Sequence, residues 1–172
     1  MEGVVIASQQ EHEEKKLKFY GRLFANIAFT EEISKEQANR ILRLGREMSY
    51  GQMCLLNLVQ NKEYFQLRKD DYIPKDESGE YLKDKNNKIY PPKMSSGEIY
   101  LLSEIYDLHI DRILNFEAPL IFGKTIGDLE YIKPDTLELE PMGKELYKLM
   151  DLHEIPEEDI AHIAQLLSEK SD

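Results

Sequence analysis

The most strongly apolar stretch of the chain covers residues 19–29, and Arg22 is its only charged residue. Read as a helix, it carries small residues at Gly21, Ala25 and Ala28, separated by four and three positions. Its large apolar residues form a second stripe, which comprises Tyr20, Leu23, Phe24 and Ile27. A helix that is apolar nearly all round is usually buried, and small residues let a neighbouring helix approach closely. We therefore expect a central core helix whose small stripe contacts the helix over residues 38–48.

The residues before this stretch are polar from Ser8 to Lys16 and include no proline. Because strong helix formers predominate there, the pattern predicts one helix over residues 4–29, solvated in its first half and buried in its second. The solvated half is a candidate partner-binding surface, with candidate residues Gln9, His12, Glu13 and Lys16. The opening residues 2–5 fit either a fraying end or a chain cut from a longer polypeptide.

Two capping boxes begin the next helices, since Gln37 follows Ser34 by three residues and Gln52 follows Ser49 in the same way. One apolar stripe marks the first of these helices: Ala38, Ile41, Leu42, Gly45 and Met48. Its basic residues form either a phosphate-binding stripe or, because acids stand beside them, a paired and solvated face. The short helix over residues 53–59 is hydrophobic on every side, which predicts that it is buried.

Residues 61–96 show the least regular pattern and are interpreted as an insertion. Short apolar pairs at 81–82 and 89–90 flank Asn86-Asn87, which favours either a small hairpin or a surface excursion. Tyr81 and Tyr90 are candidates for a partner-binding patch, although tyrosines in such a segment also pin a loop to the body of a protein.

A third capping box, Ser95 with Glu98, begins a helix that we expect to extend to Phe116. The expected apolar face comprises Ile99, Leu102, Tyr106, His109 or Ile110, and Ile113. The charged residues of this helix are four acids and Arg112, so its polar surface is expected to be negative.

The last third of the chain changes character. Residues 129–132 and 136–139 alternate apolar and polar positions, which predicts a small antiparallel hairpin that turns at Pro134-Asp135. Pro141 and Pro156 then begin two final helices. Their inward-facing residues are expected to be Met142, Leu146, Leu149, Met150, Ile160, Ile163, Ala164 and Leu167.

Residues 137–146 read Leu-Glu-Leu-Glu-Pro-Met-Gly-Lys-Glu-Leu. They are similar to the phrase L-x-L-T-P-x-G-x-x-L that joins the wing to the last helix of many winged-helix domains, with Glu140 in place of Thr. Residues 129–150 as a whole resemble that wing and helix, and the helices at 50–60 and 98–116 fit earlier parts of such a domain. Separately, the first 60 residues resemble helical regions of uncharacterised bacterial proteins, which implies no activity.

The winged-helix resemblance implies DNA binding through a basic recognition helix and wing. The wing region, residues 130–140, contains four acids and only Lys133 as a base. The net charge is −11, and residues 117–172 contribute −9 of it, with five basic and fourteen acidic side chains. Since nucleic-acid affinity depends on neutralising phosphates, nucleic acid is an unlikely partner and a basic protein partner is favoured.

The chain has 172 residues, of which 41% are hydrophobic, and this is enough for one compact unit. We expect a mainly α fold, a helical bundle with a small antiparallel β-hairpin. Residues 1–48 form a helical hairpin and residues 49–172 a winged-helix-like region with the insertion at 61–96.

No apolar run approaches the roughly 18–20 residues that span a bilayer, so we expect no membrane association and a cytoplasmic location. Cys54 stands in an apolar helix and is expected to be a buried, inert thiol.

Few residues suggest chemistry. Asp107, His109 and Asp111 are metal-ligand types, but on a helix His109 points away from Asp107. Residues 123–125, Gly-Lys-Thr, are like the end of a phosphate-binding loop, but position 118 is alanine instead of the required glycine. The sequence therefore assigns no catalytic, cofactor-binding or metal-binding residue.

The leading interpretation is a non-enzymatic protein-interaction or self-association domain of a bacterial cytoplasmic protein, forming a homo-oligomer or docking on another protein. The alternative is a winged-helix DNA-binding transcriptional regulator, which rests on fold analogy alone. An enzyme of unknown type ranks third, since it would need a concave pocket with convergent polar groups.

Overall fold

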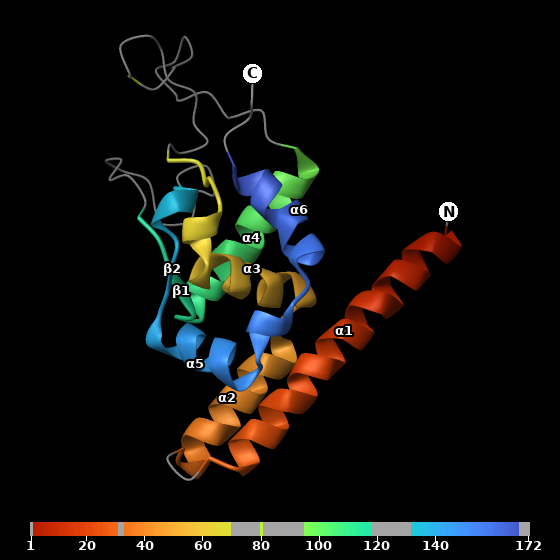
Figure 1. Ribbon diagram of the computed structural model, residues 1–172, viewed down its shortest axis with the longest axis vertical. Helices are drawn as coiled ribbons and strands as arrows, with labels where there is room; N and C mark the ends of the chain where they lie inside the picture. The colour runs from red at the N-terminus through yellow and green to blue at the C-terminus, as the bar shows by residue number, and fades with distance from the viewer. Residues whose placement is uncertain (1, 31–32, 70–79, 81–94, 118–131, 169–172) are drawn as a thin grey trace.

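The computed structural model describes residues 2–30, 33–69, 80, 95–117 and 132–168, with side chains of the first helix described from Glu14 onward. Over these residues the molecule is mainly helical and carries a two-stranded antiparallel sheet, which confirms the expected fold class (Figure 1). The elements in chain order are α1 (Glu2–Ala28), α2 (Lys35–Glu47), α3 (Tyr50–Gln60), η1 (Lys62–Tyr64), α4 (Ser96–Ile110), β1 (Leu114–Asn115), η3 (Pro134–Thr136), β2 (Glu138–Leu139), α5 (Pro141–Leu149), η4 (Leu152–Glu154) and α6 (Glu157–Leu167).

Helix α3 forms the centre of the core. It contacts α1, α4, α5 and α6, and its residues 53–59 are all buried, as its apolar sequence predicts. The three predicted capping boxes are confirmed, because Ser34, Ser49 and Ser95 each accept a hydrogen bond from the backbone three residues later. These caps fix where the three helices begin around the core.

The expected burial of α1 is wrong for one side of the helix. Phe19 and Leu23 are buried, but Leu17 and Phe24 are each 62% exposed and Phe29 is 89% exposed. The predicted contact between the small residues of α1 and helix α2 is wrong at Gly21, since a Cβ added there would meet no atom within 4 Å.

The close approach between α1 and α2 instead occurs at Gly45 on α2. A Cβ added at Gly45 would collide with the side chain of Leu23 and would lie 3.7 Å from the Tyr20 ring. The small residue of this contact therefore belongs to α2, and the large residues belong to α1. The predicted stripe of α2 is confirmed in part: Ile41, Gly45 and Met48 are buried, Ala38 and Leu42 are half-buried, and Leu44, which was not predicted, is also buried.

Helix α4 ends at Ile110, six residues before the predicted end at Phe116, because Arg112 takes a left-handed backbone conformation with φ of 56°. The predicted apolar face is also wrong in part. Ile99 and Ile110 are exposed, and the buried residues are Glu98, Leu101, Leu102, Glu104, Ile105 and Leu108. A helix with apolar residues on several sides does not reveal from sequence alone which side meets the core.

The second strand of the predicted hairpin is confirmed in part as β2, which pairs with a strand that the sequence did not predict. Leu139 of β2 pairs with Leu114 and Glu138 pairs with Asn115, so β1 immediately follows α4. The expected turn at Pro134-Asp135 belongs to η3, a single 3₁₀ turn. Of the predicted first strand, residues 129–131 lie outside the described residues, and Ile132 is buried without strand pairing.

The final two helices are as predicted. Pro141 is the first residue of α5, and Pro156 precedes α6, whose first turn carries three acids. Their predicted inward residues are buried, apart from Met142, which is half-buried. Across the parts of the chain that the structure describes, no helix combines the length and the apolar character needed to cross a membrane.

Candidate functional site

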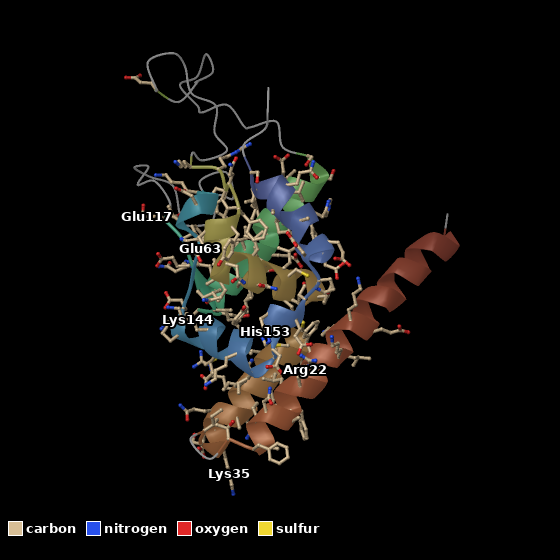
Figure 2. The ribbon with its side chains drawn as sticks, viewed as in Figure 1. Arg22, Lys35, Glu63, Glu117, Lys144 and His153 are labelled. Carbon is tan, nitrogen blue, oxygen red and sulfur yellow. The ribbon has the colours of Figure 1, made fainter. Side chains whose placement is uncertain are left out.

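Polar contacts fix one face of α1 to the C-terminal part of the molecule. The Arg22 guanidinium forms ion pairs with Glu154 and with Asp151, and Asn26 Nδ2 donates to the Leu149 carbonyl at 2.8 Å. Figure 2 shows Arg22 on the side of α1 that faces the segment carrying His153. The hydrogen bond from Arg22 lowers the pKa of Glu154 and raises that of Arg22, which keeps the pair ionised.

A second polar cluster joins α1, α3 and α6. Lys15 Nζ donates to both carboxylate oxygens of Asp159 at 3.0 Å, and Tyr50 Oη donates to Asp159 Oδ2 at 2.7 Å. Burial, together with the hydrogen bond to Asp159, raises the pKa of Tyr50. Burial also raises the pKa of the adjacent Cys54 thiol to about 12. Cys54 is buried, as expected, and because a thiolate is the nucleophilic form, a raised pKa disfavours reaction at its sulfur.

The opposite face of α1 is apolar and exposed. Leu17, Gly21, Phe24 and Ala28 follow one another at spacings of four, three and four residues, and all four are exposed. We call these four residues the α1 stripe. Ala25 lies beside it and is also exposed. In Figure 1 α1 forms one edge of the molecule beside α2, and its N-terminal half extends away from the other helices.

A buried carboxyl group lies at the beginning of α3. Glu104 accepts hydrogen bonds from Ser49 Oγ at 2.6 Å and from Tyr100 Oη at 3.2 Å. Burial raises the pKa of Glu104, while these two hydrogen bonds lower it by a smaller amount. A Cβ added at Gly51 would come within 2.9 Å of Glu104 Oε2, so glycine at this position makes room for the carboxylate.

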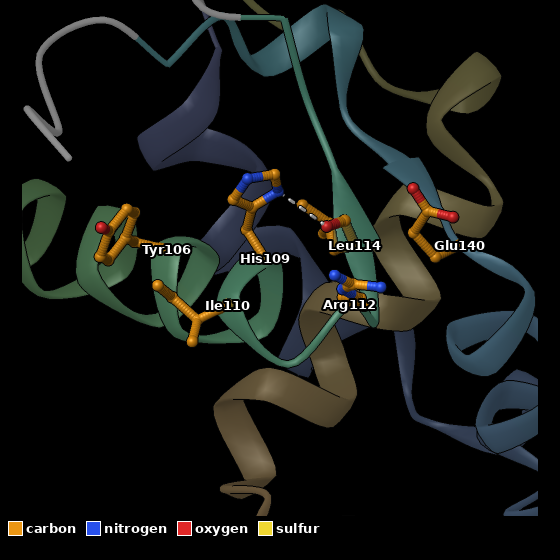
Figure 3. Close-up of a pocket in the computed structure, with 6 residues that line it drawn as sticks. All are labelled: Tyr106, His109, Ile110, Arg112, Leu114 and Glu140. Carbon is orange, nitrogen blue, oxygen red and sulfur yellow. Dashed lines mark hydrogen bonds between the residues drawn. The ribbon is translucent and has the colours of Figure 1, made fainter. Parts of the chain in front are cut away.

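A pocket of about 520 Å³ lies beside the end of α4 (Figure 3). Its lining comes from α4, the turn after α4, β1 and the residue before α5. It comprises Tyr106, His109, Ile110, Arg112, Leu114 and Glu140. His109 Nδ1 lies 3.2 Å from the Leu114 carbonyl oxygen, and its ring packs against Phe116. The pocket combines a cation, a carboxylate and an imidazole with apolar walls, which is the composition of many small-ligand sites.

The structure tests little of the partner surface predicted from the sequence. Lys16 is half-buried on α1, and the side chains of Gln9, His12 and Glu13 lie outside the described residues. Tyr81 and Tyr90 also lie outside them, as does the Gly-Lys-Thr segment at 123–125. The proposed partner surface therefore stays a prediction, with Lys16 as its one residue whose side chain is described.

Sequence reasoning missed Arg112 and Glu140 as pocket residues. The sequence suggested His109 only as a residue of the helix face or as a metal ligand, because Asp107 and Asp111 stand two residues away on either side. Arg112 enters the pocket through a left-handed conformation, and nothing in the residue type indicates it. Glu140 had one signal, since it replaces the threonine expected before Pro141.

Comparisons with protein-family models, with curated proteins and with solved structures find no match for this chain. Within the described ranges, no group of three His, Cys, Asp or Glu side chains is placed to hold a metal ion. The α1 stripe and the pocket beside α4 are therefore the two surfaces that suggest a function.

Proposed function

We propose that this chain is a non-enzymatic self-association domain in which two copies pair through the α1 stripe. The observation that carries the proposal is a run of apolar residues on the exposed face of a helix whose other face is fixed to the core. A single exposed leucine or phenylalanine is ordinary on a protein surface, whereas a contiguous apolar strip marks an interaction surface.

The spacing of the stripe favours a second copy of the same helix as its partner. Two-fold interfaces are self-complementary, because residue i of one copy meets residue j of the other and the reverse also holds. In an antiparallel pair with Gly21 opposite Phe24, the same register places Leu17 opposite Ala28. Each large residue then meets a small one, so two helices can approach closely without leaving voids.

The surroundings of the stripe also support this pairing. Spacings of four, three and four residues are those of the buried positions in paired helices. In the antiparallel register, Lys18 lies opposite Ile27 of the partner, so the central part of the interface brings no like charges together. The Arg22 and Asn26 contacts hold α1 in a fixed orientation, which reduces the entropy lost on association.

Sedimentation equilibrium over a range of protein concentrations tests the proposal. We expect the native chain to form dimers, and Phe24→Glu and Gly21→Leu to shift the chain to monomers. Both positions are exposed, and a Cβ added at Gly21 would meet no atom within 4 Å, so neither change should disturb the fold of the monomer. Tyr64→Glu is the matched control, because Tyr64 is a large exposed residue outside α1. A native chain that stays monomeric at every concentration would overturn the proposal.

Disulfide trapping tests the orientation of the two helices. A chain with Gly21→Cys mixed with a chain with Phe24→Cys should form a mixed disulfide, because the antiparallel register places these positions opposite each other. A parallel pair would instead cross-link Gly21→Cys chains with one another. Native Cys54 is buried and does not compete. Preferential cross-linking between like chains would refute the antiparallel register.

We also propose that the winged-helix-like region, residues 49–172, is adapted to proteins instead of DNA. The order helix α4, strands β1 and β2, helix α5 supports this interpretation, as does Pro141 at the first position of α5. The exposed acids Asp107 and Asp111 on and beside α4 oppose DNA binding, because they repel phosphates. We expect no retention on duplex DNA at low salt, and salt-dependent retention would favour the DNA-binding alternative.

A further inference from the structure

The pocket beside α4 contains two opposite charges that do not neutralise each other. Arg112 and Glu140 both line it, and neither forms an ion pair or a side-chain hydrogen bond within the described part of the chain. Figure 3 shows Glu140 at one side of the pocket, Tyr106 at the other, and Arg112 and His109 between them. By contrast, Arg22 on α1 forms an ion pair with Glu154.

Backbone hydrogen bonds hold the segments that carry these two charges. Arg112 has a φ of 56°, and the turn around it is closed by a bond from Ile113 N to the Leu108 carbonyl at 2.9 Å. Glu140 N donates to the Ile113 carbonyl at 3.0 Å, which joins the two segments directly. A left-handed conformation at a large residue is uncommon and is concentrated at functional sites.

The imidazole of His109 has a defined orientation. Its Nδ1 faces the Leu114 carbonyl, and because a carbonyl only accepts, Nδ1 must carry the proton of that hydrogen bond. The neutral ring therefore has its acceptor at Nε2. Apolar contact is available from Ile110, which is 62% exposed, and from the lining residue Leu114.

We propose that this pocket binds a small zwitterion with a free ammonium group, a free carboxylate and an apolar side chain, as found in an amino acid or a short peptide. Arg112 would pair with the carboxylate and Glu140 with the ammonium group. A ligand with one charge would leave the other protein charge partly desolvated without a partner, which is unfavourable. A volume of about 520 Å³ falls within the usual range for small-molecule sites and leaves room for a dipeptide. The inference is independent of self-association through α1.

Isothermal titration of the native chain with four probes tests both charges. The probes are leucine, N-acetyl-leucine, leucinamide and the dipeptide leucyl-leucine. We expect leucine or leucyl-leucine to bind at least about tenfold more tightly than either singly charged probe, since each of these lacks one charged hydrogen bond. The ratio of leucine to leucyl-leucine affinity distinguishes an amino-acid site from a peptide site. Equal binding of all four probes, or no binding at millimolar concentration, would overturn the proposal.

Two variants then assign each charge to its partner. Arg112→Asn removes the cation while keeping a residue that tolerates positive φ, and Glu140→Gln removes the anion at nearly constant shape. We expect Arg112→Asn to abolish the preference for leucine over leucinamide and to retain the preference over N-acetyl-leucine. Glu140→Gln should give the converse result. Equal loss of both preferences in each variant would reject the assignment.

Matched controls separate recognition from general electrostatics. Glu138→Gln changes an exposed acid two residues from Glu140, and Arg46→Gln changes an exposed base on α2. Neither residue lines the pocket, so both variants should keep the native order of affinities. A change in selectivity as large as that of the pocket variants would show that net charge, not the pocket, determines binding. Urea unfolding of each variant confirms that the fold is retained.

Discussion

Gly143→Ala should destabilise the protein, although alanine is the better helix former. Gly143 is buried in the first turn of α5 and packs against the backbone that enters β1. A Cβ at this position would collide with the Ile113 carbonyl oxygen and would lie 3.2 Å from the carbonyl carbon. That oxygen also accepts the hydrogen bond from Glu140 N, so the backbone has little freedom to move away.

The expected size follows from three contributions. Overpacking costs about 1–3 kcal/mol, and weakening the hydrogen bond costs about 0.5–1.5 kcal/mol. The higher helix propensity of alanine stabilises the folded state by about 1 kcal/mol. The net loss in the free energy of unfolding should be about 1–3 kcal/mol. With a urea dependence of about 2 kcal/mol per molar, the midpoint falls by about 0.5–1.5 M.

Gly97→Ala is the matched control for this measurement. Gly97 also lies in the first turn of a helix, but an added Cβ would make only ordinary contacts with Leu166, at 3.6 and 3.7 Å. It should therefore leave stability unchanged or raise it by up to about 1 kcal/mol. Equilibrium urea unfolding of both variants decides the matter. If Gly143→Ala is as stable as the native chain, or if the order of the two variants is reversed, the steric explanation is wrong.

Three further outcomes can be checked by simple measurements. Asp159→Asn should lower the free energy of unfolding, measured with urea, by about 1–2 kcal/mol, because Tyr50 loses a charged hydrogen-bond acceptor. The control variant Glu158→Gln, which changes an exposed neighbouring acid, should show little change. Burial raises the pKa of Glu104 above 4.5, so the stability advantage of the native chain over Glu104→Gln should be greatest below that pH. It should decline as the pH rises through the raised pKa, and a constant difference would contradict the direction of the shift. Cys54 should resist a thiol reagent at pH 8 in the folded protein and react fully in urea, and rapid labelling without denaturant would contradict its burial.

The features that were predictable from the sequence are local ones. A capping box needs only two residues three positions apart, so the sequence predicted that helices α2, α3 and α4 begin after Ser34, Ser49 and Ser95. The burial of helix α3 was also predictable, because a short helix that is apolar on every side has no polar face to turn toward solvent. Pro141 restricts its own backbone to the helical value of φ, and α5 begins there.

The features that were missed depend on long-range pairing. The partner of β2 is β1, which is separated from it by 22 residues between Asn115 and Glu138, and no period-two pattern marks a strand of two residues. The pocket depends on the left-handed turn at Arg112 and on the approach of Glu140 to that turn. Neither Arg112 nor Glu140 stands in a recognisable sequence motif, so their proximity follows only from the three-dimensional fold.

The error in α1 has a physical cause that bears on function. Apolar periodicity reports that a face avoids water, and it does not distinguish contact with the same chain from contact with another copy. In α1 both kinds of face are present, with Leu23 buried within the chain and Phe24 next to it exposed. If the exposed face had no partner, polar residues there would maintain the same fold with better solubility. Under the proposed self-association, the nearly continuous apolar character of residues 19–29 reflects two contacts on opposite sides of one helix, the core on one side and a second copy of the chain on the other.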